Sequence, residues 1–291
     1  EWIARATLHT METRSPTLTL TYLPHLDYNL QRLGPDLSHP RLIADLGEID
    51  ALCGELIEAA KSSGRQVIVV SEYGITPVSD AVHINRALRE AGLIKVRVEM
   101  GREQLDPGAS TAFALADHQV AHVYVQSPER LAEVSKLIAG LDGVEAVLDE
   151  EGKRDAGIDH PRAGELVAVS AADRWFSYYY WLDDARAPDY ARTVDIHRKP
   201  GYDPVELFVD PEIRSPLLAV GSRLAKRKLG MRTLLDVISL KDTQLVKGSH
   251  GRPTDDAQEG PLVISSQPDL LPADALHATD FKQLVLDHIF G

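Results

Sequence analysis

The chain has a single cysteine, Cys53, among its 291 residues. One thiol cannot form a disulfide within the chain, and it cannot supply a cysteine-rich zinc module. Cys53 lies in a helical pattern over residues 43–60, where we expect a buried structural thiol rather than a nucleophile. No signal peptide is evident, although a start inside a longer protein would hide one. Together these features favour a cytoplasmic location.

Long hydrophobic runs and an excess of positive charge are also missing. No apolar stretch approaches the roughly 20 residues that span a bilayer, so we expect no membrane span. The net charge of −13 argues against a surface for nucleic-acid polymers. No strand opens into Gly-x-Gly-x-x-Gly, which disfavours a nucleotide-dependent oxidoreductase. With 44% hydrophobic residues, the chain can bury the core of one large domain or of a domain plus a lobe.

Three apolar runs have acidic residues or a histidine beside them. The alternating run over residues 17–23 predicts a strand, and Asp27 lies just past its carboxyl end. A second predicted strand, residues 66–70, runs into Ser71-Glu72-Tyr73-Gly74-Ile75. The segment Lys247-Gly-Ser-His250-Gly251 comes just before a further apolar run over 261–265. Ligands of open α/β sheets bind beyond the strand ends, and these side chains suit a divalent cation.

The alternation of strands with helices predicts an α/β fold, with a mostly parallel sheet covered by helices on both faces. Helices are expected over residues 1–12, 42–61 and 82–91. The order of predicted elements changes between residues 93 and 160. There, strands are predicted over 93–99, 121–125 and 144–148, and a helix over 128–141. We therefore predict a core of residues 1–92 and 161–291 with a small inserted α+β lobe over 93–160. Substrate selection and a purely structural role are equally open for this lobe.

These motifs give the chain a resemblance to the alkaline phosphatase superfamily, in its type I phosphodiesterase/nucleotide pyrophosphatase branch. The branch carries Asp-x-x-Gly-His-x-x-Gly-Pro, then Ser-Asp-His-Gly-Met, then Gly-Thr-His-Gly. The corresponding segments here begin at Asp27, Ser71 and Gly248. The stretch over 162–167 is similar to the branch's Arg-x-Gly-Asp-Leu-Val strand, and 278–291 is similar to its last helix. The resemblance implies an alkaline-phosphatase-like fold.

The resemblance implies a bimetallic site with Asp and His ligands, and this chain departs from it at several positions. Carried over by position, the ligands are Asp27, Gln31, Glu72, Tyr73 and His250, so that Gln31 and Tyr73 replace two imidazoles. An oxygen-rich set suits Mn or Mg more than Zn, bound as one or two ions. His25 and His197 are further candidates for the missing nitrogen ligand, and His197 competes with His250 for one position. His250 is preferred, because the strand and helix after it fit the family's ending.

The family's nucleophile precedes the region that matches Asp27, and only residues 1–16 stand before that region here. We therefore expect the chain to be the carboxyl-terminal part of a longer protein, with its nucleophile upstream of Glu1. A phosphoryl-transfer enzyme needs that nucleophile, so the segment alone is expected to be inactive.

Two functions from different classes follow. In the first, the complete protein is a metal-dependent hydrolase of small phosphate esters, phosphodiesters or nucleotide pyrophosphates. In the second, it is a catalytically degenerate relative that binds or scaffolds, as the loss of two imidazoles would permit. The sequence leaves the substrate, the metal and the oligomeric state open.

Three other features have structural explanations that we favour over functional ones. The aromatic segment over 175–181 is expected in the core rather than around a nucleobase or aryl group. The basic run over 192–199 could meet a phosphate but is more typical of surface charge, and the cluster over 223–228 is typical of a solvated helix face. His118, like several other histidines, has no partner motif and is not expected to be a ligand.

Overall fold

The computed structural model describes residues 1–254, 256–273 and 275–291 of the chain. These residues form two compact units. Unit 1 comprises residues 1–29, 36–74 and 254–291, and unit 2 comprises residues 30–35 and 75–253. None of the described helices is long and apolar enough to cross a bilayer.

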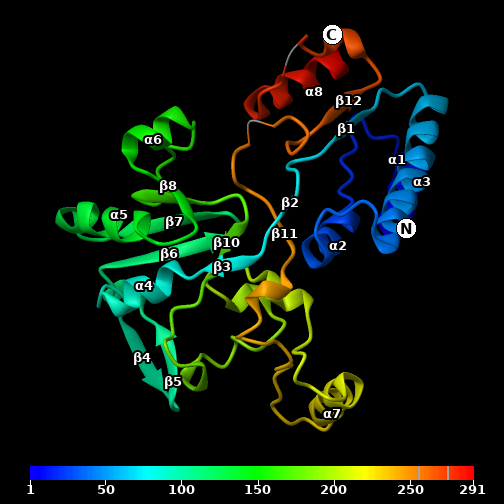
Figure 1. Cartoon of the computed structure of the whole chain (residues 1–291). Coiled ribbons are helices and arrows are strands. Elements are labelled where there is room, and N and C mark those ends of the chain that lie inside the picture. Colours follow the sequence, from blue (N-terminus) through cyan, green and yellow to red (C-terminus); the bar gives the residue numbers. More distant parts are fainter. Residues whose placement is uncertain (255, 274) are drawn as a thin grey trace. The chain divides into compact units, whose positions relative to one another are not determined.

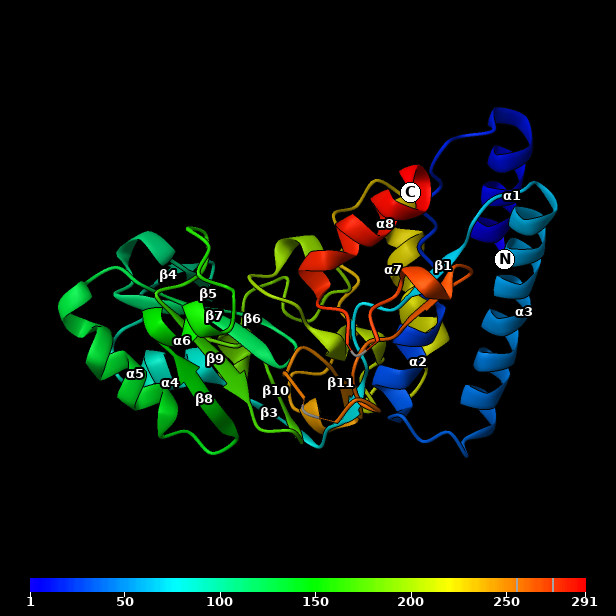
Figure 2. The ribbon, with the colours of Figure 1, turned by 90° about the horizontal axis from the view of Figure 1, so that it is seen from above.

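Unit 1 is built on two helices, α1 (Trp2–Arg14) and α3 (Pro40–Ser62), that lie side by side in both views (Figures 1 and 2). Both helices were predicted from the sequence and are confirmed. The His39 ring accepts a hydrogen bond from the Arg41 amide, and Pro40 occupies the first turn. This arrangement satisfies one of the free amides that every helix start exposes, which fixes where α3 begins.

A short ladder and a terminal helix complete unit 1. Strand β1 (Ile68–Val70) pairs antiparallel with β12 (Val263–Ser265), and Ile68 lies opposite Ser265. Helix α8 (Phe281–Phe290) ends the chain, after the 3₁₀ helices η7 (Pro268–Leu270) and η8 (Ala278–Asp280). The strands and the last helix predicted in these regions are confirmed.

The strand predicted over residues 17–23 is wrong. The segment is extended but belongs to no ladder of the described strands, and Leu18 and Leu20 are exposed. Thr21 is half-buried instead, and its hydroxyl donates to the Thr7 hydroxyl of α1 at 3.2 Å. The chain then enters helix α2 (His25–Leu33), so that Asp27 lies in a first helical turn and not in a loop beyond a strand.

Unit 2 contains a four-stranded sheet with the order β6-β7-β9-β8, in which every ladder is antiparallel (Figures 1 and 2). Its strands are β6 (Ala112–Asp117), β7 (Val120–Val125), β8 (Val144–Leu148) and β9 (Leu166–Ser170). In β6 and β7 every second residue is buried, as expected when one face of a sheet meets the core. The strands predicted over 121–125 and 144–148 are confirmed.

Helices α4 (Ile84–Glu90) and α5 (Leu131–Ala139) pack against each other, α4 on β6 and α5 on β8. Helix α6 (Glu150–Asp155) contacts β8 and β9. The sequence predicted the first two helices. The boundaries predicted at 92/93 and 160/161 remain a prediction, and β9, from beyond residue 160, pairs with both β7 and β8.

The remaining ladders are short. Strands β4 (Val96–Glu99) and β5 (Arg102–Leu105) form a hairpin, and β2 (Thr76–Pro77) pairs antiparallel with β11 (Gly248–Ser249). Strand β3 (Asp80–Val82) runs parallel to β10 (Arg174–Phe176). The α/β class is therefore confirmed, whereas among the described strands the expected parallel direction is found only in the β3–β10 pair. Tight turns such as the one between β6 and β7 join antiparallel neighbours, and parallel ones need long crossovers.

The aromatic segment over 175–181 lies in the core of unit 2, as predicted. Its rings are fully buried, and Trp181 packs edge-on against Tyr178 and Tyr180. Short 3₁₀ helices and one exposed helix, α7 (Pro216–Lys228), complete the unit. The 3₁₀ helices are η1 (Pro107–Ala109), η2 (Pro128–Arg130), η3 (Asp184–Arg186), η4 (Ile196–Arg198), η5 (Pro204–Leu207) and η6 (Thr243–Leu245).

Candidate functional site

The predicted site residues are divided between the two units. Asp27, Glu72 and Tyr73 belong to unit 1, and Gln31, His197 and His250 belong to unit 2. Helix α2 contributes to both, because Asp27 stands in its first turn and Gln31 in its last.

In unit 1 the structure brings Asp27 and Tyr73 together. The Tyr73 hydroxyl donates a hydrogen bond to Oδ1 of Asp27 at 3.1 Å. Burial, followed by the negative charge of Asp27, raises the pKa of the Tyr73 phenol. Because the phenol stays protonated, it acts towards this carboxylate as a neutral donor.

The backbone on either side of Tyr73 is held firmly. The Ser71 amide donates to the Leu262 carbonyl, and the Leu262 amide donates to the Ser71 hydroxyl, both at 2.9 Å. A side chain on Gly74 would place its Cβ 2.0 Å from the Glu259 carbonyl oxygen. The motif's glycine is thus required for close packing, while Glu72 between these anchors is exposed.

In unit 2 the end of α2 meets the segment that carries His250. The Gln31 carbonyl accepts a hydrogen bond from the Lys247 amide at 2.8 Å. Gly248 makes this approach possible, because a Cβ there would lie 2.3 Å from the Leu30 carbonyl oxygen. The Gln31 side chain is buried, and its Oε1 accepts from the Tyr202 hydroxyl at 3.4 Å.

His250 packs against a second histidine, His118. Their ring centroids are 3.8 Å apart, and the His118 ring also stacks on Tyr202 at 4.3 Å. The backbone reinforces the contact, because the Gln119 amide donates to the His250 carbonyl at 3.0 Å. Gln31, Tyr202, His118 and His250 therefore form one continuous polar and aromatic cluster within unit 2.

His118 holds an unusual position in this cluster. It is buried in the turn between β6 and β7, with a left-handed backbone (φ 56°) that non-glycine residues seldom adopt. Burial, and then the charge of His250, hold the pKa of His118 well below its usual range. The ring is therefore neutral near pH 7 and can accept or donate a hydrogen bond. Ser249 Oγ lies 3.4 Å from its Nδ1.

The two alternative histidines lie elsewhere. His197 is exposed on η4. His25, in unit 1, has its Nε2 3.6 Å from Asp45 Oδ1 and 3.5 Å from Glu48 Oε2, both on α3. Its imidazole therefore faces the acids of that helix.

Sequence reasoning missed two members of the cluster, His118 and Tyr202. The available signal was the pair Asp117-His118 between two alternating strands, which marks a tight turn. Nothing local shows that this turn lies next to His250, because the two histidines are far apart in the chain. His118 was accordingly set aside as a lone histidine; that it is not a ligand stays a prediction, while its contact with His250 was not foreseen.

The next question is whether the described side chains are placed to coordinate a metal ion. Among residues 1–254, 256–273 and 275–291, no group of three His, Cys, Asp or Glu side chains is placed to hold one. Within unit 1 the Asp27 carboxylate already accepts from Tyr73, and within unit 2 the His118 and His250 rings contact one another. As placed, these donors do not form a metal centre.

The comparisons with known proteins agree with the motifs. The sequence model of the type I phosphodiesterase / nucleotide pyrophosphatase family matches residues 1–203. The matched span includes the motifs that begin at Asp27 and Ser71, and the segment at Gly248 lies beyond it. The chain belongs to the type I phosphodiesterase / nucleotide pyrophosphatase family. No curated protein matches the chain significantly.

Solved structures share the fold. A phosphonoacetate hydrolase from Sinorhizobium meliloti 1021, in complex with phosphonoformate, matches with a TM-score of 0.55 and 16% identity, over 99% of this chain and 55% of its own. An inactive variant of murine ectonucleotide pyrophosphatase / phosphodiesterase 5, in complex with AMP, matches with a TM-score of 0.54 and 16% identity, over 98% and 57%. The chain spans about half the length of these structures.

Proposed function

We propose that the complete protein hydrolyses small phosphate esters, phosphodiesters or nucleotide pyrophosphates. The supporting observation is the family match over residues 1–203, which includes the Asp27 and Ser71 motifs in the family's order. The solved relatives in complex with AMP and phosphonoformate are consistent with a small phosphorus-containing substrate. This segment, which spans about half the length of the solved relatives, is proposed to be silent alone.

Members of the family are generally metal-dependent, and we extend that requirement to the complete protein as part of the proposal. Asp27, Glu72 and His250 are the proposed ligands, with Gln31, Tyr73 and His197 as further positions. The set is rich in oxygen, which favours Mn or Mg over Zn, as one or two ions. Because the described donors do not form a metal centre, no catalytic step is assigned to an ion.

The described residues themselves have two roles in this proposal. The neutral Tyr73 hydroxyl donates to Oδ1 of Asp27. This hydrogen bond holds the carboxylate in one orientation and thereby also sets the position of its second oxygen, Oδ2. The His118 ring packs against the His250 ring at an interplanar angle of 34°, and the hydrogen bond from the Gln119 amide holds the backbone of His250. Such supporting contacts commonly fix the orientation of a working side chain. A cytoplasmic location, supported by the lone Cys53, belongs to the same proposal.

A second candidate function is a degenerate family member that binds a phosphoester or acts as a scaffold. The Tyr73 contact favours it, because a protonated phenol occupies an oxygen of Asp27 where the family has an imidazole. Catalysis would then be lost while the fold is kept.

One experiment separates the two functions. The complete protein is freed of metal with a chelator, reloaded with Mn, Mg or Zn, and assayed on p-nitrophenyl phosphate and on its diester analogue. Turnover that returns with metal and is lost in Asp27→Ala supports the hydrolase. Nucleotide binding by the complete protein, with no turnover under any metal, supports the degenerate member and refutes the hydrolase.

A further inference from the structure

The basic cluster over 223–228, which the proposed function does not use, lies on α7 in a region of strongly segregated charge. Between residues 214 and 235 the chain has six basic residues and no acidic one, although its net charge is −13. These residues are Arg214, Arg223, Lys226, Arg227, Lys228 and Arg232. Such segregation marks a surface that attracts anions rather than an average solvated face.

The same segment exposes large apolar side chains. Leu217 is 90% exposed and Leu229 is 78% exposed, and Leu218, Leu224 and Met231 are exposed as well. Helix α7 has no fully buried residue, and it packs against the rest of unit 2 through Val220. The leucines therefore do not belong to the core of the unit, and the helix presents them to solvent beside its cations.

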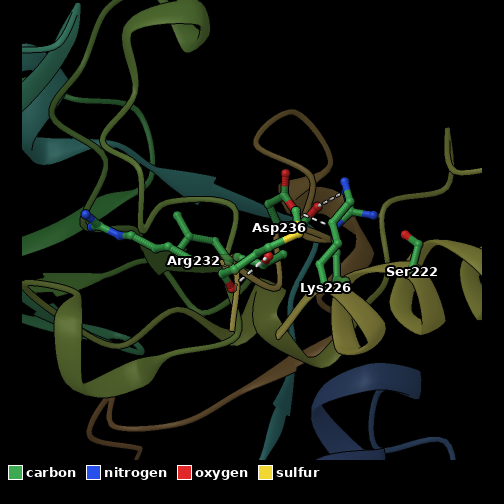
Figure 3. Close-up of a pocket in the computed structure, with 8 residues that line it drawn as sticks. Ser222, Lys226, Arg232 and Asp236 are labelled. Atoms are coloured by element: carbon green, nitrogen blue, oxygen red, sulfur yellow. Dashed lines mark hydrogen bonds and ion pairs between the residues drawn. The ribbon is translucent and has the colours of Figure 1, made fainter. Parts of the chain in front are cut away.

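A hollow of about 430 Å³ opens along α7. It is lined by the cations Arg223, Lys226 and Arg232 and by the hydroxyls of Ser222 and Thr233, while Asp236 pairs with Arg223. Figure 3 shows Ser222 and Lys226 on α7, next to the segment that carries Arg232 and Asp236. The two hydroxyls donate to the Ala219 and Met231 carbonyls, and Arg232 lies 3.9 Å from Asp189. The attraction of this hollow for a phosphate group therefore rests on the charge of its cations.

Helical spacing joins the hollow to the apolar side chains. Leu218, Ser222 and Lys226 follow each other at four-residue intervals and so lie in one row along α7. Leu217 and Leu224 lie on the neighbouring side, two turns apart. Exposed leucines beside a basic hollow fit the boundary between acyl chains and headgroups, where leucines enter the apolar layer and Lys and Arg reach the phosphates.

We propose that α7 and the segment through Arg232 form a docking surface for an anionic lipid bilayer. The helix lies in the plane of the interface, with Leu217, Leu218 and Leu224 inserted and the hollow facing a lipid phosphate. A folded acidic partner, including a second copy of this chain, would match the charge alone. The bilayer also accounts for apolar side chains and cations that alternate along one short helix.

Co-sedimentation of the 291-residue chain with vesicles tests this surface. We expect binding to phosphatidylcholine vesicles in which about one lipid in three is phosphatidylserine, little binding to phosphatidylcholine alone, and release as salt is raised. Lys226→Glu with Lys228→Glu should lower the partition coefficient about 25-fold or more. Leu217→Ser with Leu218→Ser should lower it at least about tenfold.

Matched controls change the same chemistry elsewhere on the surface. Lys61→Glu with Lys136→Glu reverses two exposed charges on α3 and α5, and Leu20→Ser with Leu182→Ser removes two exposed leucines. Both controls should bind the anionic vesicles as the parent chain does. Circular dichroism confirms that each variant is folded.

Any of four results would overturn the proposal. The parent chain could remain in the supernatant with anionic vesicles, or it could bind both vesicle types equally. The controls could lose as much binding as the α7 variants. Salt-sensitive self-association without vesicles, abolished by the α7 variants, would assign the surface to a second copy of the chain instead.

Discussion

The Tyr73 hydroxyl lies 3.1 Å from Oδ1 of Asp27 and joins two sequence motifs within unit 1. One partner comes from the first turn of α2, and the other from the segment after β1. An ionised carboxylate strengthens such a bond, and the raised pKa of the phenol keeps the proton on the donor. The contact thereby fixes the position of Asp27, one of the proposed metal ligands.

Tyr73→Phe removes this hydrogen bond but keeps the ring. We expect the free energy of unfolding to fall by about 1–2 kcal/mol, as for a hydrogen bond to a charged group in a partly buried site. Urea unfolding measures the change. Tyr28→Phe, on an exposed ring of α2, is the control and should change little. Equal effects in the two variants would show that the Asp27 contact contributes nothing.

Gly248→Ala places a methyl group where the Leu30 carbonyl oxygen would be 2.3 Å away. Because backbone cannot yield as a flexible side chain does, we expect a loss of about 2 kcal/mol or more. Gly221→Ala is the matched control on α7, where a Cβ would meet nothing within 4 Å. It should stabilise the helix by about 0.5–1 kcal/mol. Thermal unfolding of both variants checks the contrast, and a harmless Gly248→Ala would contradict the close approach.

Lys199→Met leaves two carboxylates without their cation. The Lys199 ammonium lies 2.8 Å from Asp203 and 2.7 Å from Glu206, with its side chain fully buried. Loss of one partner from a buried ion pair costs about 3–5 kcal/mol, because the remaining charge is stranded. Lys61→Met removes the exposed pair with Glu58 and should cost less than about 1 kcal/mol. Similar midpoints for the two variants in denaturant would show that the Lys199 network is not buried.

The lowered pKa of His83 predicts how the free energy of unfolding depends on pH. Burial, and then the charge of Arg86, lower the pKa of His83 to about 4, while an unfolded chain has a histidine pKa of about 6.5. Since the unfolded state binds the proton first, this stability is complete above about pH 6.5 and is lost as the pH falls to about 4. The loss is on the order of 3 kcal/mol.

His83→Gln should therefore flatten the pH profile of unfolding in that window, measured by urea midpoints. His118, whose pKa is lowered by burial, acts in the same direction and leaves a residual slope. His9→Gln, on an exposed residue of α1, serves as the control. An unchanged profile in His83→Gln would refute the assignment.

The sequence predicted the elements that local pattern alone defines. Helix α3 has an apolar periodicity over many turns with Pro40 at its start, and β7 and β8 are compact runs of β-branched and apolar residues. The alternation over 17–23 gave the wrong answer, because a strand also needs a partner. There Thr21 contacts α1, while Leu18 and Leu20 are exposed. The direction of each strand could not be predicted from local pattern either, because it depends on the partner strand.

Only the candidate site residues that lie within a family motif could be predicted from the sequence. Asp27, Tyr73, Gln31 and His250 were found because the family motifs fix their order in the chain. His118 and Tyr202 carry no such signal, and only tertiary packing brings them to His250 and Gln31. The motif glycines, by contrast, have a physical basis that the sequence could not show: Gly74 and Gly248 sit where a backbone carbonyl leaves no room for a Cβ.

Metal-restored turnover of a phosphodiester by the complete protein tests the central claim most directly. We expect the chelated protein to be inactive on the p-nitrophenyl diester, Mn or Mg to restore hydrolysis, and Asp27→Ala to abolish it while Tyr28→Phe retains it. A complete, folded protein that shows no hydrolysis with Mn, Mg or Zn would contradict the claim that this family member is a hydrolase.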